Sequence, residues 1–296
     1  MLTPATVNTL LAEHGLHPKK SLGQNFLVDP NTARRIASLA AVPPGGRVLE
    51  IGPGLGSLTL ALVELGHDVV AVELDARLAA VLGSVLASAG ISERVQIHVG
   101  DACSVPLGDL LDADPPGGDA ADTDVLAPDA PGWSCVSNLP YNVAVPVVMR
   151  LLEETPAIER LLVLVQREVG ERLAAGPGDP AYGAVSVKVA YFAEAAVVGL
   201  VPPTVFVPRP KVESALVRMR RRASPPVSVP SSAELFTLVR GGFAQRRKML
   251  RRSLQPVLGD RTVAVLADAG VDPTARAETL GLEQWASVAR SAAAAA

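Results

Sequence analysis

Acidic side chains stand where successive strand-like runs of the sequence end, and their spacing suits a nucleotide pocket. The run 47–52 ends in a turn containing Gly52 and Gly54, which leads straight into a helical pattern. Glycines let the backbone turn sharply and approach a ligand, and a helix N-terminus offers unpaired N–H groups. Glu73 ends the next run, 73 − 52 = 21 residues on, where a carboxylate can accept both hydroxyls of a ribose. Asp101 follows the third run, in position to read an adenine.

This pattern favours a bound adenosine cofactor over a purely structural turn. A glycine-rich turn alone is weak support, because tight strand-to-helix turns use glycine for structural reasons. Three consecutive strands that each end in a ligand-type residue are not required by core packing. Nicotinamide and methionine-sulfonium cofactors both fit the pattern, because a fold alone does not assign a function.

The fourth strand-like run ends in a motif suited to methyl transfer onto an adenine amine: Asn138, Leu139, Pro140 and Tyr141. That amine is a poor nucleophile, since its lone pair is delocalised into the ring. An Asn side-chain carbonyl and a backbone carbonyl, stiffened by the proline, can accept both N–H protons and orient the nitrogen. Tyr141 would stack on a flipped base, and Phe206 could cover its other face. On spacing alone, an ordinary strand-to-helix turn explains the motif equally well.

The elements that must position these residues alternate between strands and helices. Alternation of this kind predicts a doubly wound α/β domain with a mostly parallel sheet covered on both faces. We expect strands at 47–52, 68–74, 94–100, 134–139, 160–166, 195–201 and 215–220, and helices at 56–65, 76–88, 143–153 and 184–193.

A second, smaller domain is expected at the C-terminal end. Residues 224–232 are rich in proline and serine and have no periodic apolar face, which is typical of a linker. The chain is therefore expected to divide into a domain at 1–223, this linker, and a small α-helical domain with three short helices at 233–296.

Charge is segregated along the chain. Between Val205 and Arg252 there are twelve Lys or Arg and two Glu, a balance of 12 − 2 = +10. A solvated surface is the usual fate of such a run. Residues 245–252, however, lack acidic partners at i,i+4 and continue an amphipathic helical pattern from Leu235, so a polyanion-binding basic face is favoured. The candidate nucleic-acid contacts are Arg209, Lys211, Arg246, Arg247, Lys248 and Arg251.

Composition excludes several other classes of protein. Cys103 and Cys135 form no CxxC and do not join the histidines in a ligand spacing, so neither a disulfide scaffold nor a metal site is expected. The sequence shows no membrane span and no secretion signal, and we expect a cytoplasmic monomer. Seven Asp and no Lys or Arg lie between Ser104 and Trp133, within a Pro/Gly-rich loop.

Five segments resemble those of a known enzyme family, the small-subunit ribosomal RNA adenine N6,N6-dimethyltransferases (KsgA/RsmA family). In chain order they are KSLGQNFL (20–27), EIGPGLG (50–56), NLPYN (138–142), FVPRPKVES (206–214) and FAQRRK (243–248). The resemblance implies a Rossmann-like class I methyltransferase fold with S-adenosylmethionine as methyl donor. It also implies a substrate, two adjacent adenines in a hairpin near the 3′ end of 16S rRNA within the immature small subunit, each methylated twice.

The same resemblance implies roles for individual residues. Cofactor contacts would come from Asn25, Leu27, Gly52, Gly54, Glu73, Asp101 and Asn138. The target base would be held by Asn138, Leu139, Pro140 and Tyr141, with Phe206 as a second stacking face. The acidic loop at 107–131 is longer than the family pattern, and we expect it to face away from the ribosome because RNA would repel it.

Two other functions remain open. One is the related macrolide-resistance methyltransferase, which modifies an adenine of the large subunit; the helical tail and the NLPYN form favour the small subunit. The other is a non-catalytic assembly factor that binds RNA, although a pure binder would not need Asn138 or Glu73.

Overall fold

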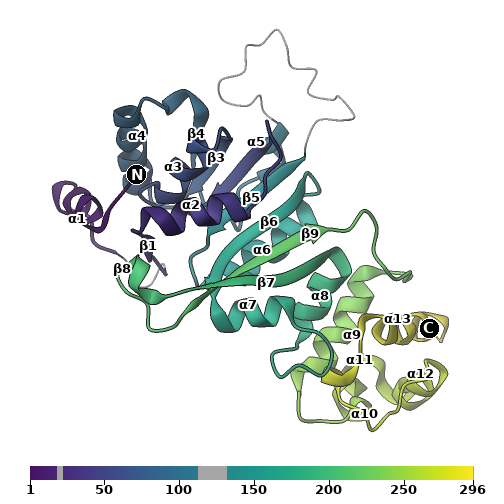
Figure 1. Ribbon diagram of the computed structural model, residues 1–296. Coiled ribbons are helices and arrows are strands. Elements are labelled where there is room, and N and C mark those ends of the chain that lie inside the picture. Colours follow the sequence, from purple (N-terminus) through teal and green to yellow (C-terminus); the bar gives the residue numbers. More distant parts are fainter. Residues whose placement is uncertain (19–22, 113–131, 296) are drawn as a thin grey trace. The chain divides into compact units, whose positions relative to one another are not determined.

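The computed structural model describes residues 1–18, 23–112 and 132–295 (Figure 1). Residues 20–22 of the first family-like segment lie outside these ranges. So does most of the acidic loop expected at 107–131, whose orientation therefore stays a prediction.

A single seven-stranded sheet forms the core of the larger unit, with strand order β4-β3-β2-β5-β6-β9-β7. The strands are β2 (Arg47–Ile51), β3 (Asp68–Glu73), β4 (Val95–Val99), β5 (Trp133–Asn138), β6 (Ile158–Gln166), β7 (Ala193–Val201) and β9 (Ser214–Arg221). A separate two-stranded sheet pairs β1 (Phe26–Leu27) with β8 (Phe206–Val207).

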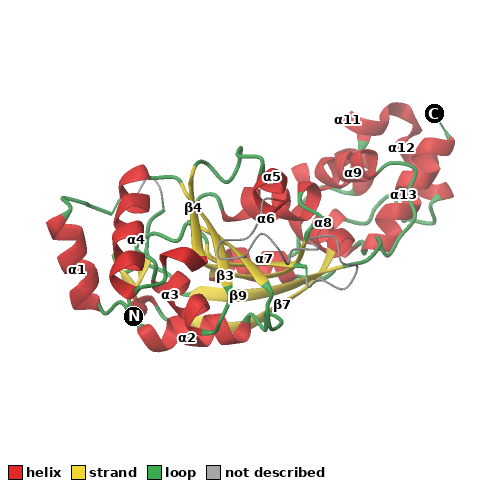
Figure 2. Cartoon of the chain, turned by 90° about the horizontal axis from the view of Figure 1, so that it is seen from above, coloured by secondary structure: helices red, strands yellow, loops and turns green. Residues whose placement is uncertain are grey.

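The sheet is mostly parallel, as the alternating pattern predicts. β4, β3, β2, β5 and β6 run parallel to their neighbours, and β9 runs antiparallel to β6. The central residues of β2, β3, β5 and β6 are almost all buried, because helices cover both faces of a parallel sheet, whereas β4 at the edge is half-buried. In Figure 2, α2 and α3 lie on one side of the strands and α5 and α6 on the other.

The four helices expected at 56–65, 76–88, 143–153 and 184–193 begin and end within one residue of those positions, as α3, α4, α6 and α8. The helices of the described residues are α1 (Pro4–Glu13), α2 (Pro30–Leu39), α3 (Ser57–Glu64), α4 (Ala76–Ala89), α5 (Leu107–Asp112), α6 (Ala144–Glu154), α7 (Arg167–Ala174), α8 (Ala184–Phe192), α9 (Ser232–Ala244), α10 (Leu250–Ser253), α11 (Gln255–Leu258), α12 (Thr262–Asp268) and α13 (Leu282–Ala294). Short 3₁₀ turns lie at Ser92–Arg94, Pro203–Val205, Gly259–Arg261 and Ala277–Thr279. Among the described residues, no helix is long and apolar enough to cross a bilayer.

The strand order reverses between β2 and β5, and there the two strands separate. They pair only through Val48 with Ser134 and Leu49 with Cys135. Beyond that point the backbone N–H of Ile51 donates to the Ser137 hydroxyl (2.9 Å), a side-chain bond in place of a ladder bond. The separation opens the carboxyl edge of the sheet, where ligands of doubly wound folds bind.

The chain divides into two compact units that do not follow chain order. Residues 1–170 and 196–221 form one unit, and residues 171–195 and 222–295 belong to the other. The helical unit therefore includes α8, which the composition of the sequence does not indicate. The boundaries at 223 and 233 and the linker between them stay predictions.

The helical unit has its own core around Trp285, which is fully buried. Gly242 lies so close to this ring that a Cβ there would stand 2.4 Å from the indole. The Tyr182 hydroxyl donates to the Leu280 carbonyl (2.9 Å) and its ring meets Phe243 edge-on. Instead of three helices after residue 232, the unit has α9 to α13, because several helices last only one or two turns.

Candidate functional site

The glycine-rich turn after β2 uses backbone conformations that glycine favours. Gly52, Gly54 and Gly56 have φ values of 69°, 58° and 94°. A Cβ on Gly54 would lie 3.0 Å from the Phe26 ring, so any side chain there would push against residues 25–27. The turn ends at the N-terminus of α3, whose first residue is Ser57.

Glu73 reaches this turn from the end of β3. One carboxylate oxygen accepts the N–H of Gly54 (3.0 Å) and the other that of Asp75 (3.0 Å). The side chain is 5% exposed, and burial raises the pKa of the Glu73 carboxyl above its ordinary value. The glycine turn and the carboxylate 21 residues on, which the sequence predicts to act together, therefore touch.

Asn138 ends β5 and is oriented by a second asparagine. Its Nδ2 donates to the backbone carbonyl of Asn25 (3.0 Å), and Asn25 Nδ2 donates to the carbonyl of Gly23 (3.1 Å). An amide that uses its nitrogen in this way leaves its oxygen as an acceptor with a fixed direction. Asn138 is therefore held ready to accept a hydrogen bond from a ligand.

The turn after Asn138 is held from both ends. The N–H of Leu139 donates to the Leu164 carbonyl (3.1 Å), and the N–H of Val143 closes the turn onto the carbonyl of Pro140 (3.1 Å). The hydroxyl of Tyr141 lies 2.6 Å from that of Ser214, and burial raises the pKa of the Tyr141 phenol. These bonds fix the Tyr141 ring beside the acceptor of Asn138.

The segment that carries Asn25 is fastened to two parts of the fold. β1 pairs with β8, so Leu27 lies opposite Phe206 and Phe26 opposite Val207. The hydroxyl of Ser57, at the start of α3, donates to the Leu27 carbonyl. The glycine turn, the N-terminal segment and the 206–214 turn are thereby joined.

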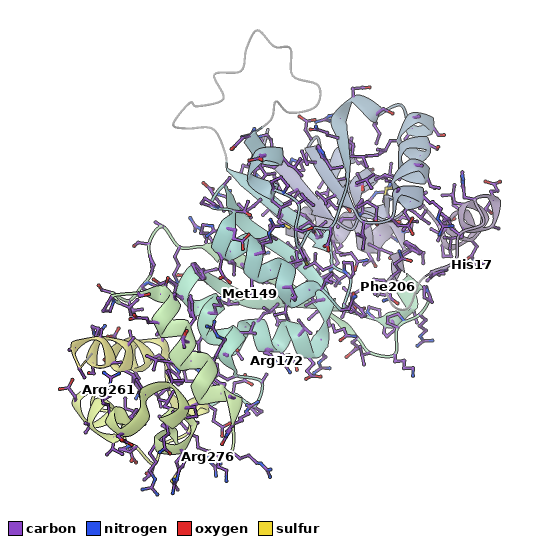
Figure 3. The ribbon with its side chains drawn as sticks, turned by 180° about the vertical axis from the view of Figure 1, so that it is seen from behind. His17, Met149, Arg172, Phe206, Arg261 and Arg276 are labelled. Carbon is purple, nitrogen blue, oxygen red and sulfur yellow. The ribbon has the colours of Figure 1, made fainter. Side chains whose placement is uncertain are left out.

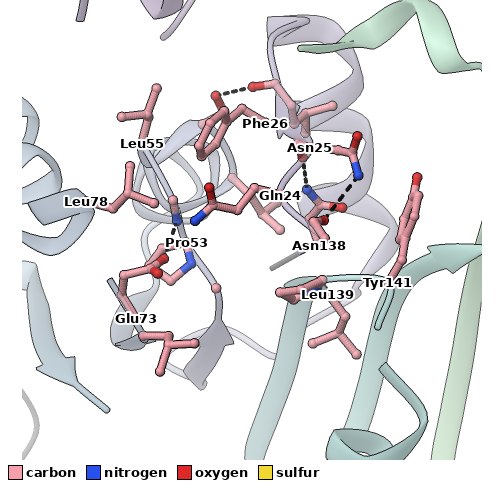
Figure 4. A pocket seen from close by; sticks show the side chains of 18 residues that line it. Gln24, Asn25, Phe26, Pro53, Leu55, Glu73, Leu78, Asn138, Leu139 and Tyr141 are labelled. Atoms are coloured by element: carbon pink, nitrogen blue, oxygen red, sulfur yellow. Dashed lines mark hydrogen bonds between the residues drawn. The ribbon is translucent and has the colours of Figure 1, made fainter. Parts of the chain in front are cut away.

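These groups line one pocket (Figure 4). Among its lining residues are the predicted site residues Asn25, Leu27, Gly52, Gly54, Glu73, Asn138, Leu139, Pro140 and Tyr141. Gln24, Phe26, Leu55 and Leu78 line it as well and are missing from the sequence-based set. Gln24 and Phe26 flank Asn25 in the first family-like segment, which is the signal that could have found them. Leu78 lies in α4 and has no such signal.

Two of the predicted cofactor and target-base contacts do not line this pocket. Asp101 is exposed and accepts the N–H of Cys103 (2.8 Å), so in this structure it caps its own turn. Phe206, labelled in Figure 3, is 2% exposed and packs in the main core. The roles of Asp101 toward an adenine and of Phe206 as a stacking face stay predictions.

A second cavity of about 690 Å³ adjoins the pocket, because Tyr141, Gln24 and Asn25 line both. Its wall includes Arg209 and Lys211, two of the predicted nucleic-acid contacts. Among the described residues that line it there is no carboxylate. The neighbouring Glu213 pairs with Arg167 (2.9 Å), which leaves the cavity positively charged.

The other predicted RNA contacts lie in the helical unit: Arg246, Arg247 and Lys248 on a turn where we expected a helix, and Arg251 in α10. α9 ends at Ala244, and residues 245–249 turn toward α10. The turn forms because buried Leu250 anchors the chain by donating its N–H to the Ala275 carbonyl (2.8 Å).

The cations of this turn and of α10 differ in their contacts. Arg246 pairs with Glu278 (3.0 Å) and also bonds the Pro180 carbonyl. Arg247, Lys248 and Arg251 are exposed and form no ion pair with any residue the structure describes.

In the same described ranges, no group of three His, Cys, Asp or Glu side chains is arranged to hold a metal.

Known proteins resemble this chain over nearly its full length. The sequence profile of the ribosomal RNA adenine dimethylase family matches residues 15–294. Proteins named "Ribosomal RNA small subunit methyltransferase A" from Thermobifida fusca and Streptomyces coelicolor are 45% and 44% identical. Each alignment covers 98% of this chain, and 95% and 96% of the relatives.

Solved structures agree with the sheet topology. The crystal structure of the 23S rRNA methyltransferase ErmE matches with a TM-score of 0.62 and 28% identity, over 90% of this chain and 99% of its own. The crystal structure of a dimethyladenosine transferase from Plasmodium falciparum matches with a TM-score of 0.66 and 22% identity, over 89% of this chain and 95% of its own. At that identity the likeness shows the fold alone. The Rossmann-like methyltransferase fold expected from the sequence is confirmed.

Proposed function

This chain belongs to the ribosomal RNA adenine dimethylase family, and we propose that it dimethylates the N6 amines of two adjacent adenines near the 3′ end of 16S rRNA. The observation that carries the proposal is the Asn138 amide, oriented by the Asn25 carbonyl, beside the anchored ring of Tyr141. A strand-to-helix turn with a purely structural role needs neither an outward-facing acceptor nor an aromatic ring at its mouth.

The pocket suits S-adenosylmethionine as the methyl donor. Glu73 supplies a carboxylate for a ribose diol, the glycine turn leaves space beside it, and Leu55 and Leu78 offer apolar walls. When bound, this cofactor supplies an electrophilic methyl group. Asn25, Leu27 and Gly52 line the same pocket and are proposed cofactor contacts.

The residues of the chain orient the target amine. The Asn138 side-chain oxygen and the Leu139 carbonyl accept its two N–H protons, which directs the nitrogen lone pair away from them. Tyr141 stacks on the base, a contact worth about 1–3 kcal/mol. Preorganised acceptors need no strong general base, because the amine loses its proton only after the new bond forms.

The substrate is ribosomal RNA of the small subunit, in an immature particle. The two relatives described above carry the small-subunit name at 44–45% identity, whereas the large-subunit enzyme ErmE shares 28%. Arg209 and Lys211 border the cavity next to the pocket, and Arg247, Lys248 and Arg251 add an exposed basic surface. One chain supplies all of these groups, which supports a monomer. We propose that this monomer acts in the cytoplasm and without a metal.

The test is methyl transfer to defined particles. The protein is incubated with labelled S-adenosylmethionine and either small subunits that lack the modification or unmodified large subunits, and digested RNA is analysed by mass spectrometry. We expect dimethyladenosine at two adjacent small-subunit positions and none with Asn138→Ala. Label only in the large subunit would identify the resistance activity, and tight binding without label would leave an RNA-binding assembly factor.

A further inference from the structure

The cavity of about 690 Å³ beside the catalytic pocket has its own set of recognition groups. We propose that it binds the adenine that neighbours the target adenine, with Gln166 reading the base and Arg209 and Lys211 holding the RNA backbone. This inference rests on the proposed function, since it needs a substrate with two adjacent adenines.

The cavity adjoins the pocket closely enough for one dinucleotide to occupy both. Tyr141 and Asn25 line both the pocket and the cavity. When the target base stacks on Tyr141 in the pocket, the next base of the RNA therefore lies at the cavity. The volume falls within the range of about 300–1,000 Å³ that is usual for small-molecule sites. A nucleotide therefore fits without displacing the fold.

Gln166 is the polar side chain of the cavity that is free to read a base. It is the last residue of β6, the strand beside β5, so its amide lies at the same sheet edge as Asn138. Its backbone is held opposite Ser214 in β9, and its half-buried side chain makes no hydrogen bond with any described residue. The amides of Gln24, Asn25 and Asn142, by contrast, belong to residues already engaged in interactions.

A glutamine amide matches adenine through two hydrogen bonds. Its oxygen accepts from the exocyclic amine and its nitrogen donates to N7, a pairing worth roughly a tenfold or greater preference over another base. A guanine presents acceptors at both O6 and N7, so the amide oxygen meets a repulsion whichever way the amide is turned. The amide therefore selects adenine at the neighbouring position.

The two cations of the cavity suit a phosphate. Pro208 and Pro210 fix the backbone φ on either side of Arg209. The backbone from which the Arg209 side chain projects therefore has little conformational freedom. Arg209 and Lys211 are exposed and form no ion pair with a described residue. Glu213, the nearest acid along the chain, is held by Arg167 at 2.9 Å and does not neutralise them.

The test pairs a protein change with an RNA change. Methylation rates are measured for wild-type and Gln166→Ala protein on small subunits with both adenines, and on subunits in which either adenine in turn is replaced by guanine. The cavity lies on one side of the target, so wild type should lose about tenfold in kcat/KM at the remaining adenine for one of the two replacements. At that same adenine, Gln166→Ala should lose about tenfold on the native pair and less than a further twofold on the replaced pair.

Controls separate this inference from the proposed function. Gln96→Ala, a half-buried glutamine of β4 at the other end of the sheet, should behave as wild type. The affinity of Gln166→Ala for S-adenosylmethionine, measured by calorimetry, should stay within twofold. Independent, multiplying effects of the two changes, or no loss with Gln166→Ala, would overturn the neighbouring-base site. Absence of methylation by wild type on every particle would overturn the proposed function itself.

Discussion

The hydroxyl of Tyr141 lies 2.6 Å from the hydroxyl of Ser214, and Ser214 is fully buried. Ser214 is the first residue of β9, so the sheet itself fixes the far end of the Tyr141 side chain. Tyr141 follows the turn after β5 and lines both the pocket and the second cavity. A ring fixed at both ends offers a base a stacking face in one orientation.

Ser214→Ala should lower the methylation rate by loosening this ring. We expect a decrease of about 3- to 10-fold in kcat, in line with the loss of one hydrogen bond worth about 0.5–1.5 kcal/mol. The KM for small subunits and the affinity for S-adenosylmethionine should change less than twofold. Steady-state kinetics of Ser214→Ala, Tyr141→Phe and the double variant make the measurement. If the two losses multiplied in the double variant, the hydroxyl pair would not be the cause.

Asn138→Ala should abolish methyl transfer while RNA binding stays intact. The substitution removes the acceptor oxygen and the bond to Asn25, and a comparable loss of a preorganised group costs about 100- to 1,000-fold in rate. Single-turnover rates and filter binding of small subunits give the two values. Asn31→Ala, an exposed asparagine of α2, is the control. An equal loss of RNA affinity would assign Asn138 to binding.

Gly54→Ala should weaken cofactor binding specifically. The new Cβ would stand 3.0 Å from the Phe26 ring, at a φ of 58° that costs a side chain about 1–2 kcal/mol. Gly66→Ala is a matched control, because Gly66 has a φ of 88° with nothing within 4 Å of the added Cβ. Both variants should lose stability in denaturant titrations because of the positive φ, and Gly54→Ala should lose more, because only its Cβ meets a ring. Only Gly54→Ala should lose S-adenosylmethionine affinity in calorimetry, by tenfold or more.

Most of the sheet could be predicted from the sequence, because its strands are continuous apolar runs between helical patterns. β2 to β6 begin and end within two residues of the expected positions. The meeting of Glu73 with the glycine turn was also predictable, since parallel strands end at one edge.

Other features depend on contacts between distant segments, which no local pattern reports. The two-residue pairing of β1 with β8 is too short to leave a periodic signal, yet it brings Asn25 to Asn138. The prediction that the helix from Leu235 continues through the basic residues 245–252 was wrong for a similar reason. The helix ends at Ala244, because buried Leu250 is held by its hydrogen bond to the Ala275 carbonyl. Gln166 looked like an ordinary strand end, because nothing nearby in sequence indicates a cavity.

The stability of the protein should fall as pH rises through the neutral range, because of Glu50. Complete burial raises the pKa of this carboxyl to about 8 from an ordinary 4.5. The hydrogen bond that the Thr59 hydroxyl donates to it (2.6 Å) lowers the pKa, but by less than burial raises it. Between these two pKa values the folded protein keeps a proton that the unfolded chain has released. Raising the pH therefore favours unfolding, by an amount on the order of a few kcal/mol over the whole window.

Glu50→Gln should remove most of this pH dependence and leave the smaller part that comes from the raised pKa of Glu73. The amide keeps the shape of the side chain and cannot ionise, so the variant should be about as stable as wild type at pH 4 and more stable at pH 9. Urea titrations at several pH values give the free energy of unfolding for both proteins. Parallel pH profiles for the two proteins would show that Glu50 is not the group responsible.

The exposed cations at the turn after α9 should set the salt dependence of RNA binding, and Arg246 should matter less than its neighbours. Each cation that meets a phosphate releases counterions, so losing one lowers the slope of log K against log salt by about 0.7–0.9. Arg247→Ala with Lys248→Ala should therefore lower the slope by roughly 1.5. Arg246→Ala should lower the slope by less than half of the change expected for one lost phosphate contact, since that guanidinium already pairs with Glu278 at 3.0 Å. Binding isotherms at several salt concentrations decide this, and an equal effect of all three residues would mean that the Glu278 pair opens when RNA binds.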